Sequence, residues 1–148
     1  EVFLLASPKL VGVILKQASE LGLNAQFSNI GVEGPDTVAI AGALAEGLLY
    51  PYSYDNHGIE DGVVSFYKQY TTRFDGEPDT LAANSYDAAY LLSACLETNG
   101  DEVEKVKACL YGTKDFKGAG GTFSIDQNGD AVKDIFIKTI RDGKFVKL

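Results

Sequence analysis

The sequence predicts an α/β protein in which βαβ parallel-sheet units are followed by an antiparallel C-terminal hairpin tail. Three observations support this fold class. A strand, a helix and a second strand follow one another within about 30 residues, which is the spacing of a right-handed βαβ crossover. The middle of the chain has the apolar spacing of helices. Near the end, Asn128-Gly129 and Asp142-Gly143 separate β-rich segments, and such dipeptides are strong hairpin signals.

The parallel sheet is predicted in the first part of the chain. Residues 2–6 form one strand, and residues 25–30 form a second strand after an intervening helix. A helical turn over residues 36–41 leads to a third strand over residues 46–52. We therefore expect the carboxyl ends of these parallel strands to meet at one edge of the sheet.

The helix between the first two strands has clear signals at both ends. Ser7 can cap a free backbone N–H with its hydroxyl, and Pro8 is favourable in a first helical turn. Gly22 is placed to end the helix. Apolar residues at helical spacing predict its buried face: Val11, Ile14, Leu15, Ala18 and Leu21.

The middle of the chain is predicted to form three helices. The first covers residues 58–74, and the second covers residues 80–97. The buried face of the second is predicted at Ala82, Tyr86, Ala89, Leu92 and Leu96. The third helix begins with a capping-box-like pair, Asp101 and Glu104. Its inner face is predicted at Val103, Val106 and Leu110.

A glycine-rich connector over residues 114–121 precedes the C-terminal strands. These strands are predicted over residues 122–126, 131–141 and 144–148. The two turn dipeptides between them pair each strand with the next in antiparallel fashion.

Composition excludes several classes of function. The chain has 148 residues, of which 45% are hydrophobic and 23% are charged, as in a folded domain with a buried core. Its formal net charge of -8 argues against nucleic acid or an anionic membrane as the main partner, because both require a basic surface. No apolar segment reaches the roughly 18–20 residues that span a bilayer.

The chain begins inside an apolar, strand-like segment, without an initiating Met or a basic leader. The given sequence therefore shows no signal peptide, and removal of one on export could have taken further upstream sequence with it. We therefore expect this chain to be the C-terminal part of a longer polypeptide.

The residues do not predict a catalytic, metal or cofactor site. Nucleophilic catalysis would need Cys95 or Cys109 activated by a base such as His57, which lies in a polar loop typical of exposed histidines. One His and two Cys match no zinc pattern, and residues 126–130 lack the final Glu of a calcium loop. Residues 118–121 lack the Gly-Lys-Ser/Thr of a phosphate-binding loop. We expect no enzyme; a thiol hydrolase using Cys95 and His57 is the alternative.

The two cysteines have a second possible use as a disulfide. Cys95 lies late in one predicted helix and Cys109 late in the next, with a short turn between the helices. Closing a loop of this size stabilises a fold by roughly 3 kcal/mol in the chain-entropy model. An oxidising compartment would allow the bond, and two buried thiols are the alternative.

A ligand site is predicted beyond the carboxyl ends of the parallel strands, where ligands collect in open α/β sheets. Ser7 follows the first strand, Asn29 lies at the end of the second, and Glu33 lies in the loop of residues 31–34. The Ser7 hydroxyl and the first helical N–H groups can bind a small polar ligand, and Glu33 can accept an ammonium. The alternatives are a plain helix cap for Ser7 and a solvated charge for Glu33.

Three alternating tyrosines follow the third predicted strand. Tyr50, Tyr52 and Tyr54 have the spacing of residues on one face of an extended chain. They either line a cleft or pack at the surface.

Several segments, in the correct order, resemble type I periplasmic binding proteins, the leucine/isoleucine/valine-binding relatives that serve ABC importers. The matching segments are residues 2–4 and 15–23 (second lobe), 41–48 (a crossing between lobes), 86–94 (a long helix), 116–130 (the last crossing) and 142–146 (the last strand). The resemblance extends over the whole chain.

This resemblance implies a two-lobed type I periplasmic-binding-protein fold, of which the chain is the C-terminal portion. Residues 1–45 and 123–148 would belong to lobe two, and residues 48–118 to lobe one. It implies a bacterial protein, periplasmic or lipid-anchored, that binds an amino acid or a related small polar molecule by hinge closure. The implied partners are this ligand, an ABC permease and the missing N-terminal portion of the same protein. A ligand-sensing receptor domain of the same fold is the alternative.

The chain departs from the pattern of its relatives at two site positions. The position where relatives present an aromatic side chain to the ligand falls on Ser7. The acid that binds an α-ammonium falls near Ile30-Gly31, with Glu33 shortly after it. Either Glu33 takes this role through a shifted loop, or the ligand is not an α-amino acid.

Overall fold

The computed structural model describes residues 1–30 and 33–148. These residues divide into two units: unit 1 comprises Glu1–Tyr52 and Ile135–Leu148, and unit 2 comprises Ser53–Asp134. The chain therefore passes from one unit to the other twice. The second passage follows Asp134, so residues 123–134, which the resemblance assigned to lobe two, lie in unit 2 together with residues 53–118.

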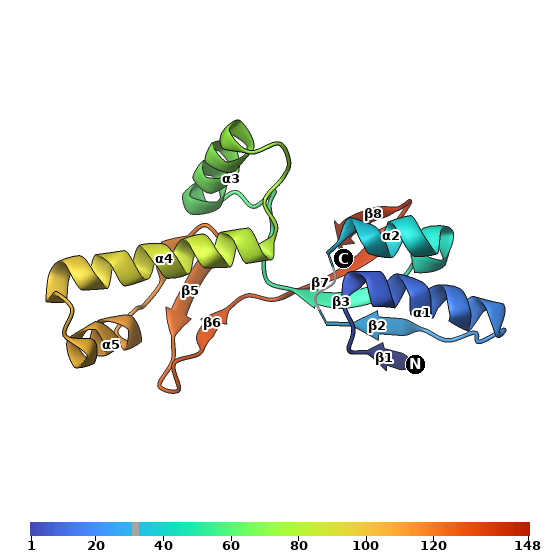
Figure 1. Ribbon diagram of the computed structural model, residues 1–148, viewed down its shortest axis with the longest axis horizontal. Coiled ribbons are helices and arrows are strands. Elements are labelled where there is room, and N and C mark those ends of the chain that lie inside the picture. The colour runs from blue at the N-terminus through green and yellow to red at the C-terminus, as the bar shows by residue number, and fades with distance from the viewer. Residues whose placement is uncertain (31–32) are drawn as a thin grey trace. The chain divides into compact units, whose positions relative to one another are not determined.

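Unit 1 contains a five-stranded sheet in the order β1-β2-β3-β7-β8 (Figure 1). Its strands are β1 (Val2–Leu4), β2 (Phe27–Asn29), β3 (Leu49–Tyr52), β7 (Phe136–Arg141) and β8 (Lys144–Lys147). The first three are parallel to one another, whereas β7 is antiparallel to both β3 and β8. The predicted parallel βαβ start and the antiparallel hairpin tail are both confirmed.

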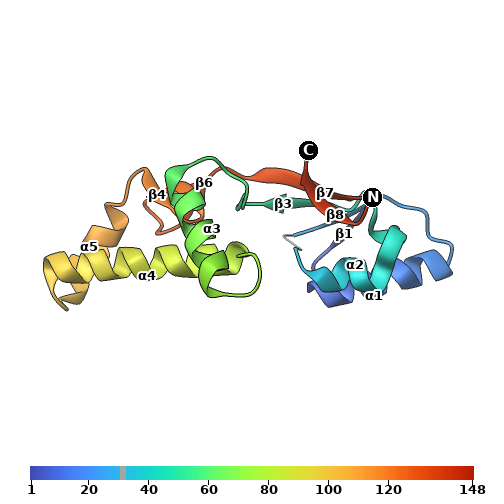
Figure 2. The ribbon, with the colours of Figure 1, turned by 90° about the horizontal axis from the view of Figure 1, so that it is seen from above.

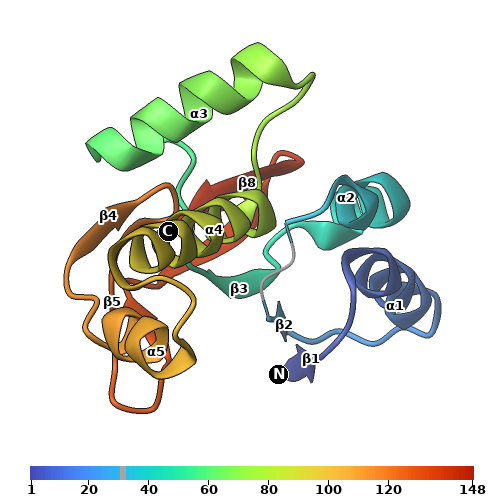
Figure 3. The same ribbon diagram turned by 60° about the vertical axis from the view of Figure 1, so that its left-hand side comes forward.

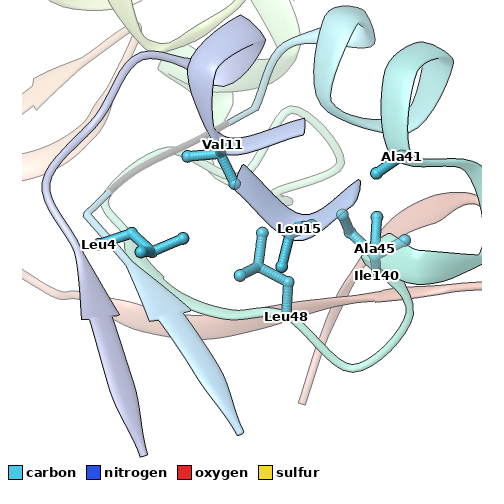
Figure 4. Packing of buried hydrophobic residues seen from close by; sticks show 7 residues of the cluster. All are labelled: Leu4, Val11, Leu15, Ala41, Ala45, Leu48 and Ile140. Atoms are coloured by element: carbon cyan, nitrogen blue, oxygen red, sulfur yellow. The ribbon is translucent and has the colours of Figure 1, made fainter. Parts of the chain in front are cut away.

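One face of this sheet is covered by α1 (Pro8–Glu20), α2 (Pro35–Ala41) and the short 3-10 helix η1 (Gly42–Ala45), as Figure 2 shows for α1 and α2. The core of unit 1 lies between these helices and the sheet (Figure 4). It consists of Leu4, Val11, Leu15, Ala41, Ala45, Leu48 and Ile140. The opposite side of β1 leaves Phe3 exposed, and Leu5 after it is exposed as well.

The predicted inner face of α1 is mostly correct. Val11, Leu15 and Ala18 are buried, whereas Leu21 is 85% exposed. Leu21 lies beyond the last helical residue, and Gly22 (φ 72) turns the chain there, so the helical spacing no longer directs Leu21 to the sheet.

Unit 2 combines three helices with a three-stranded antiparallel sheet in the order β4-β5-β6; Figure 3 shows β4 and β5 of this sheet. Its elements are α3 (Asp61–Arg73), α4 (Thr80–Asn99), α5 (Val103–Tyr111), β4 (Phe116–Gly118), β5 (Gly121–Ile125) and β6 (Ala131–Lys133). The segment predicted as a connector thus contains the strand β4. The segment 131–141, predicted as one strand, is two: β6 in unit 2 and β7 in unit 1.

The buried side of α4 differs from the prediction. Its buried residues are Ala83, Asp87 and Cys95. The predicted inner residues Tyr86, Leu92 and Leu96 are exposed, as is Val103 of α5. Asp87 and Cys95 both form bonds to neighbouring segments, and these bonds decide which side of α4 faces the interior of unit 2.

A disulfide joins α4 to α5. Cys95 and Cys109 are bonded, with their Cα atoms 5.8 Å apart, and α5 lies beside the C-terminal half of α4 (Figures 1 and 3). A bonded sulfur cannot act as a thiolate nucleophile, so the alternative of a thiol hydrolase using Cys95 is wrong. Among the described residues, no helix combines the length and the apolar character needed to cross a bilayer.

Candidate functional site

The predicted site residues gather at the carboxyl edge of the parallel strands of unit 1. Ser7 follows β1, Asn29 is the last residue of β2, and Glu33 lies between β2 and α2. Gly31 and Val32, which belong to the same predicted loop, lie outside the described residues. The geometry of this edge is therefore given by the residues that come before Gly31 and after Val32.

The segment before α2 is held against the start of α1. A Cβ atom added at Gly34 would lie only 2.7 Å from the Cβ of Pro8, so a residue with a side chain does not fit there. The Thr37 hydroxyl, in the first turn of α2, donates a hydrogen bond of 3.0 Å to the Pro8 carbonyl oxygen. Because Ser7 precedes Pro8 and Glu33 precedes Gly34, this contact places both predicted site residues beside the same junction.

Asn29 contributes an unpaired acceptor to this edge. The residue is fully buried, and its Nδ2 donates a hydrogen bond of 3.4 Å to the Ala6 carbonyl oxygen. A carbonyl can only accept, which fixes the orientation of the amide. The Oδ1 atom then has no hydrogen-bond partner among the residues that the structure describes. A buried acceptor of this kind is stabilised by any donor group placed next to it.

Ser7 is exposed and stands at the N-cap position of α1, but its side chain makes no cap hydrogen bond. Its backbone carbonyl accepts the Val11 N–H in the usual way. The Ser7 hydroxyl is therefore available to a polar group approaching the helix N-terminus.

Glu33 is paired within unit 1. Its Oε1 atom accepts a hydrogen bond of 2.9 Å from the Tyr50 hydroxyl and forms an ion pair with the Lys138 ammonium. Tyr50 is 1% exposed and Lys138 is 8% exposed. The alternative of a fully solvated loop charge is therefore incorrect for Glu33, because an ammonium of its own chain already contacts this carboxylate.

Strand pairing explains how Lys138 reaches Glu33. Lys138 of β7 lies directly opposite Tyr50 of β3 in the antiparallel ladder, and Tyr52 is the next residue on the same face of β3. The Lys138 ammonium also lies 5.0 Å from the centre of the Tyr52 ring, within the range of a cation–π interaction. The three tyrosines were predicted to line a cleft or to pack at the surface, and Tyr50 and Tyr52 instead belong to the buried side of this cluster.

The cluster keeps Tyr50 protonated. Burial raises the pKa of the Tyr50 phenol far above its ordinary value, and the negative charge of Glu33 raises it further. Tyr50 therefore remains a hydrogen-bond donor to Glu33 throughout the neutral pH range.

Sequence reasoning did not identify Lys138. The residue lies on β7, and its partner Glu33 lies near the start of the chain. One signal was present: in the alternating pattern of β7, Lys138 falls on the same face as Ile140, which is a core residue. A charged residue at a buried position of a strand requires a partner.

A second buried carboxylate, Asp87 of α4, binds backbone in unit 2. Its Oδ1 accepts the Ala119 N–H at 2.6 Å, and its Oδ2 accepts the Gly120 N–H at 2.8 Å. The turn between β4 and β5 thus does present N–H groups to an anion, but the anion is a side chain of the same unit. Sequence reasoning missed this role for Asp87.

The loop that superficially resembled a calcium site is a hairpin turn. The Asp126 Oδ1 atom accepts the backbone N–H groups of Asn128 and Asp130 at 2.8 and 2.9 Å. These hydrogen bonds lower the pKa of the Asp126 carboxyl. In the described part of the chain, no group of three or more His, Cys, Asp or Glu side chains could hold a metal ion.

Comparison with known proteins identifies the fold. The structure resembles that of a leucine-binding protein, LivK, from Thermotoga maritima, with a TM-score of 0.88 and 28% identity over 99% of this chain and 43% of that one. It also resembles the branched-chain amino acid transporter substrate-binding protein LivJ from Streptococcus pneumoniae, solved in complex with isoleucine. The TM-score there is 0.81, with 25% identity over 99% of this chain and 44% of that one. The fold is that of a type I periplasmic binding protein.

A third similar structure is an extracellular ligand-binding receptor from Desulfohalobium retbaense. The TM-score is 0.83, with 25% identity over 99% of this chain and 26% of that one. No curated protein matches the sequence significantly. The model of the family described as periplasmic binding protein matches residues 2–144. The chain belongs to the periplasmic binding protein family, a family of solute-binding proteins, and it spans less than half the length of the relatives compared here.

Proposed function

We propose that this chain is part of the solute-binding component of an ABC importer, which binds an amino acid or a related small polar molecule by hinge closure. The observation that carries the proposal is the carboxyl edge of the parallel strands of unit 1, where Ser7, Asn29 and Glu33 lie beside the ends of β1 and β2. The names of two similar proteins, which bind leucine or isoleucine, support the class of ligand. An extracytoplasmic location follows from the same family membership.

The edge offers several kinds of hydrogen bond to a small polar molecule. The exposed Ser7 hydroxyl donates or accepts, and the N–H groups at the start of α1 donate. The Asn29 Oδ1 atom is a further acceptor, but it is buried and would need local rearrangement to reach a ligand. Such a set suits a ligand with both donor and acceptor groups. No chemistry on the ligand is required of these residues, which fits binding and release.

We further propose that units 1 and 2 are portions of lobe two and lobe one, respectively, of a longer protein. The similar proteins are more than twice as long as this chain. Unit 2 contains an open apolar groove of about 760 Å³ beside α3, lined among others by Phe66, Tyr70, Phe74 and Tyr86. Further polypeptide of the same protein would cover this groove and the exposed Phe3 of β1.

A ligand-sensing receptor domain is the second candidate function. It is favoured by the similarity to the extracellular ligand-binding receptor from D. retbaense, of which this chain covers 26%. The two candidates share the same ligand site and differ only in the partner that detects the closed state. Co-purification of the full-length protein with a membrane permease would support the importer component.

A ligand screen of the full-length protein tests the proposal. Thermal unfolding would be followed in the presence of amino acids, small amides, aromatic acids and short peptides. A ligand at 100 times its dissociation constant should stabilise the protein by about 2.7 kcal/mol. Glu33→Gln should change the affinity for the ligand that responds, whereas Lys144→Gln, at an exposed position of β8, should not. Flat responses to every class of ligand would contradict a transport role for these molecules.

A further inference from the structure

We propose that Lys138 determines ligand specificity at the carboxyl edge of unit 1. Its ammonium balances the charge of Glu33, so that the edge selects ligands that present no ammonium group to this carboxylate. The favoured class is carboxylic acids and amides that lack a free amino group. This inference rests on the proposed solute-binding function and names the ligand class within it.

Within the part of the chain that the structure describes, the Glu33 carboxylate makes its contacts through one oxygen and leaves the other open. Tyr50 and Lys138 both contact Oε1. The Oε2 atom has no hydrogen-bond partner among the described residues. The Glu33 side chain is 21% exposed and that of Lys138 only 10%. Because the Glu33 side chain is the more exposed of the two, a ligand that reaches this pair meets Glu33 before the lysine.

Lys138 is fixed beside Glu33 by more than the ion pair. Its backbone is held opposite Tyr50 by the β3–β7 ladder, and its ammonium lies over the face of the Tyr52 ring. The aliphatic part of the side chain is buried as well. A ligand that occupies Oε2 consequently does not displace the lysine.

The fixed ammonium makes the open oxygen a poor site for a second cation. A ligand ammonium at Oε2 would gain the attraction of Glu33 but would also meet the like charge of Lys138 on the same carboxylate. A neutral N–H or O–H donor gains a hydrogen bond to Oε2 and meets no comparable repulsion. The pair as a whole is neutral, so it does not favour a cationic group as an isolated carboxylate would.

Two ligands that differ by one amino group provide the test. Isothermal titration of the full-length protein would measure the dissociation constants of L-leucine and 4-methylpentanoate, which share a carboxylate and a side chain. In Lys138→Gln, we expect the ratio of the two affinities to shift toward leucine by about tenfold or more, because Glu33 becomes an uncompensated carboxylate. Lys138→Arg, which keeps the charge, should retain the ratio of the wild type.

Lys144→Gln is the matched control, because it removes the same charge from an exposed position of β8 and should leave the ratio unchanged. Glu33→Gln tests the inference independently if Lys138→Gln does not fold. It leaves the Lys138 charge uncompensated, so the ratio should shift toward 4-methylpentanoate.

The outcomes separate this inference from the proposed function. If the ligands bind and Lys138→Gln changes both affinities by the same factor, the role of Lys138 is only structural and the inference is wrong, while the solute-binding function stands. An unchanged ratio in a folded Glu33→Gln variant also overturns it, as does tighter binding of L-leucine than of 4-methylpentanoate by the wild type. If neither ligand binds to the wild type or to any variant, both the inference and the proposed function are contradicted for these ligands.

Discussion

The Oδ2 atom of Asp87 accepts a hydrogen bond of 2.8 Å from the backbone N–H of Gly120, and this bond joins the middle of α4 to the turn between β4 and β5. The second carboxylate oxygen binds the neighbouring Ala119 N–H. Gly118 comes so close to the same carboxylate that a Cβ atom there would overlap it. A single side chain thus anchors the sheet of unit 2 to its longest helix.

Replacing Asp87 with Ala should lower the free energy of unfolding by about 3–5 kcal/mol, because two N–H groups would be left buried without an acceptor. Urea-induced unfolding of the full-length protein would measure the loss. Asp75→Ala, which removes an exposed carboxylate, should change stability by no more than about 0.5 kcal/mol. A loss below about 1 kcal/mol for Asp87→Ala would indicate that water replaces the carboxylate.

Tyr54→Phe should stabilise the protein at neutral pH by about 1 kcal/mol. Tyr54 is buried, and its hydroxyl has no hydrogen-bond partner among the described residues, so the substitution removes an unsatisfied polar group. Thermal or urea unfolding of both proteins would measure the difference. Tyr90→Phe, at an exposed position of α4, serves as the control and should have little effect. A destabilised Tyr54→Phe variant would show that the hydroxyl has a partner in solution.

Tyr54→Phe should also change how the free energy of unfolding depends on pH in the alkaline range. Burial raises the pKa of Tyr54 to about 12, compared with about 10 in an unfolded chain. Below pH 10 the phenol is protonated in both states. Between about pH 10 and 12 the unfolded state loses this proton first, so the Tyr54 contribution to stability falls as pH rises. The advantage of Tyr54→Phe over the wild type should therefore grow across this range, and a constant difference would contradict the assignment.

Removing the disulfide by the double substitution Cys95→Ala and Cys109→Ala should lower the free energy of unfolding by about 3 kcal/mol, the value expected for a loop with a sequence separation of 14. Denaturant unfolding with and without a reducing agent would measure the effect. Reductant should destabilise the wild type and leave the double variant unchanged. Equal midpoints for the oxidised and reduced wild type would show that the bond does not contribute to stability.

Ser7→Ala should weaken ligand binding about fivefold without changing the stability of the unliganded protein. The Ser7 hydroxyl makes no cap hydrogen bond, so its removal should alter the free energy of unfolding by no more than about 0.5 kcal/mol. Loss of one hydrogen bond to the ligand costs about 1 kcal/mol. Calorimetric titration and urea unfolding of the same variant would separate the two effects. A destabilised variant with unchanged affinity would identify Ser7 as a cap alone.

Local signals predicted most of the fold of unit 1. Pro8, Gly22 and the Asp142-Gly143 turn act on neighbouring residues, so their effects follow from the sequence alone. The buried face of α4 could not be predicted in this way. Apolar residues lie on several sides of that helix, and the side that faces inward is decided by Asp87 and Cys95, whose partners lie in other elements.

The candidate site was likewise only partly predictable from the sequence. Ser7, Asn29 and Glu33 could be placed at one edge because the carboxyl ends of parallel strands must meet there. The partners of Glu33 could not be placed, because Lys138 reaches it only through the pairing of β7 with β3. The pairing of strands that lie far apart in the sequence depends on the tertiary fold, so local sequence patterns do not predict it.

The two passages of the chain between the units have a consequence for folding during synthesis. All of Ser53–Asp134 is synthesised before β7 and β8, although β3 needs β7 as its neighbour in the sheet. Unit 2 is continuous and can fold as soon as it has emerged, whereas the growing chain must carry β3 with an unpaired edge until Ile135–Leu148 appears. We therefore expect nascent chains that stop before Ile135 to be protected from proteolysis in unit 2 and to bind chaperones through unit 1.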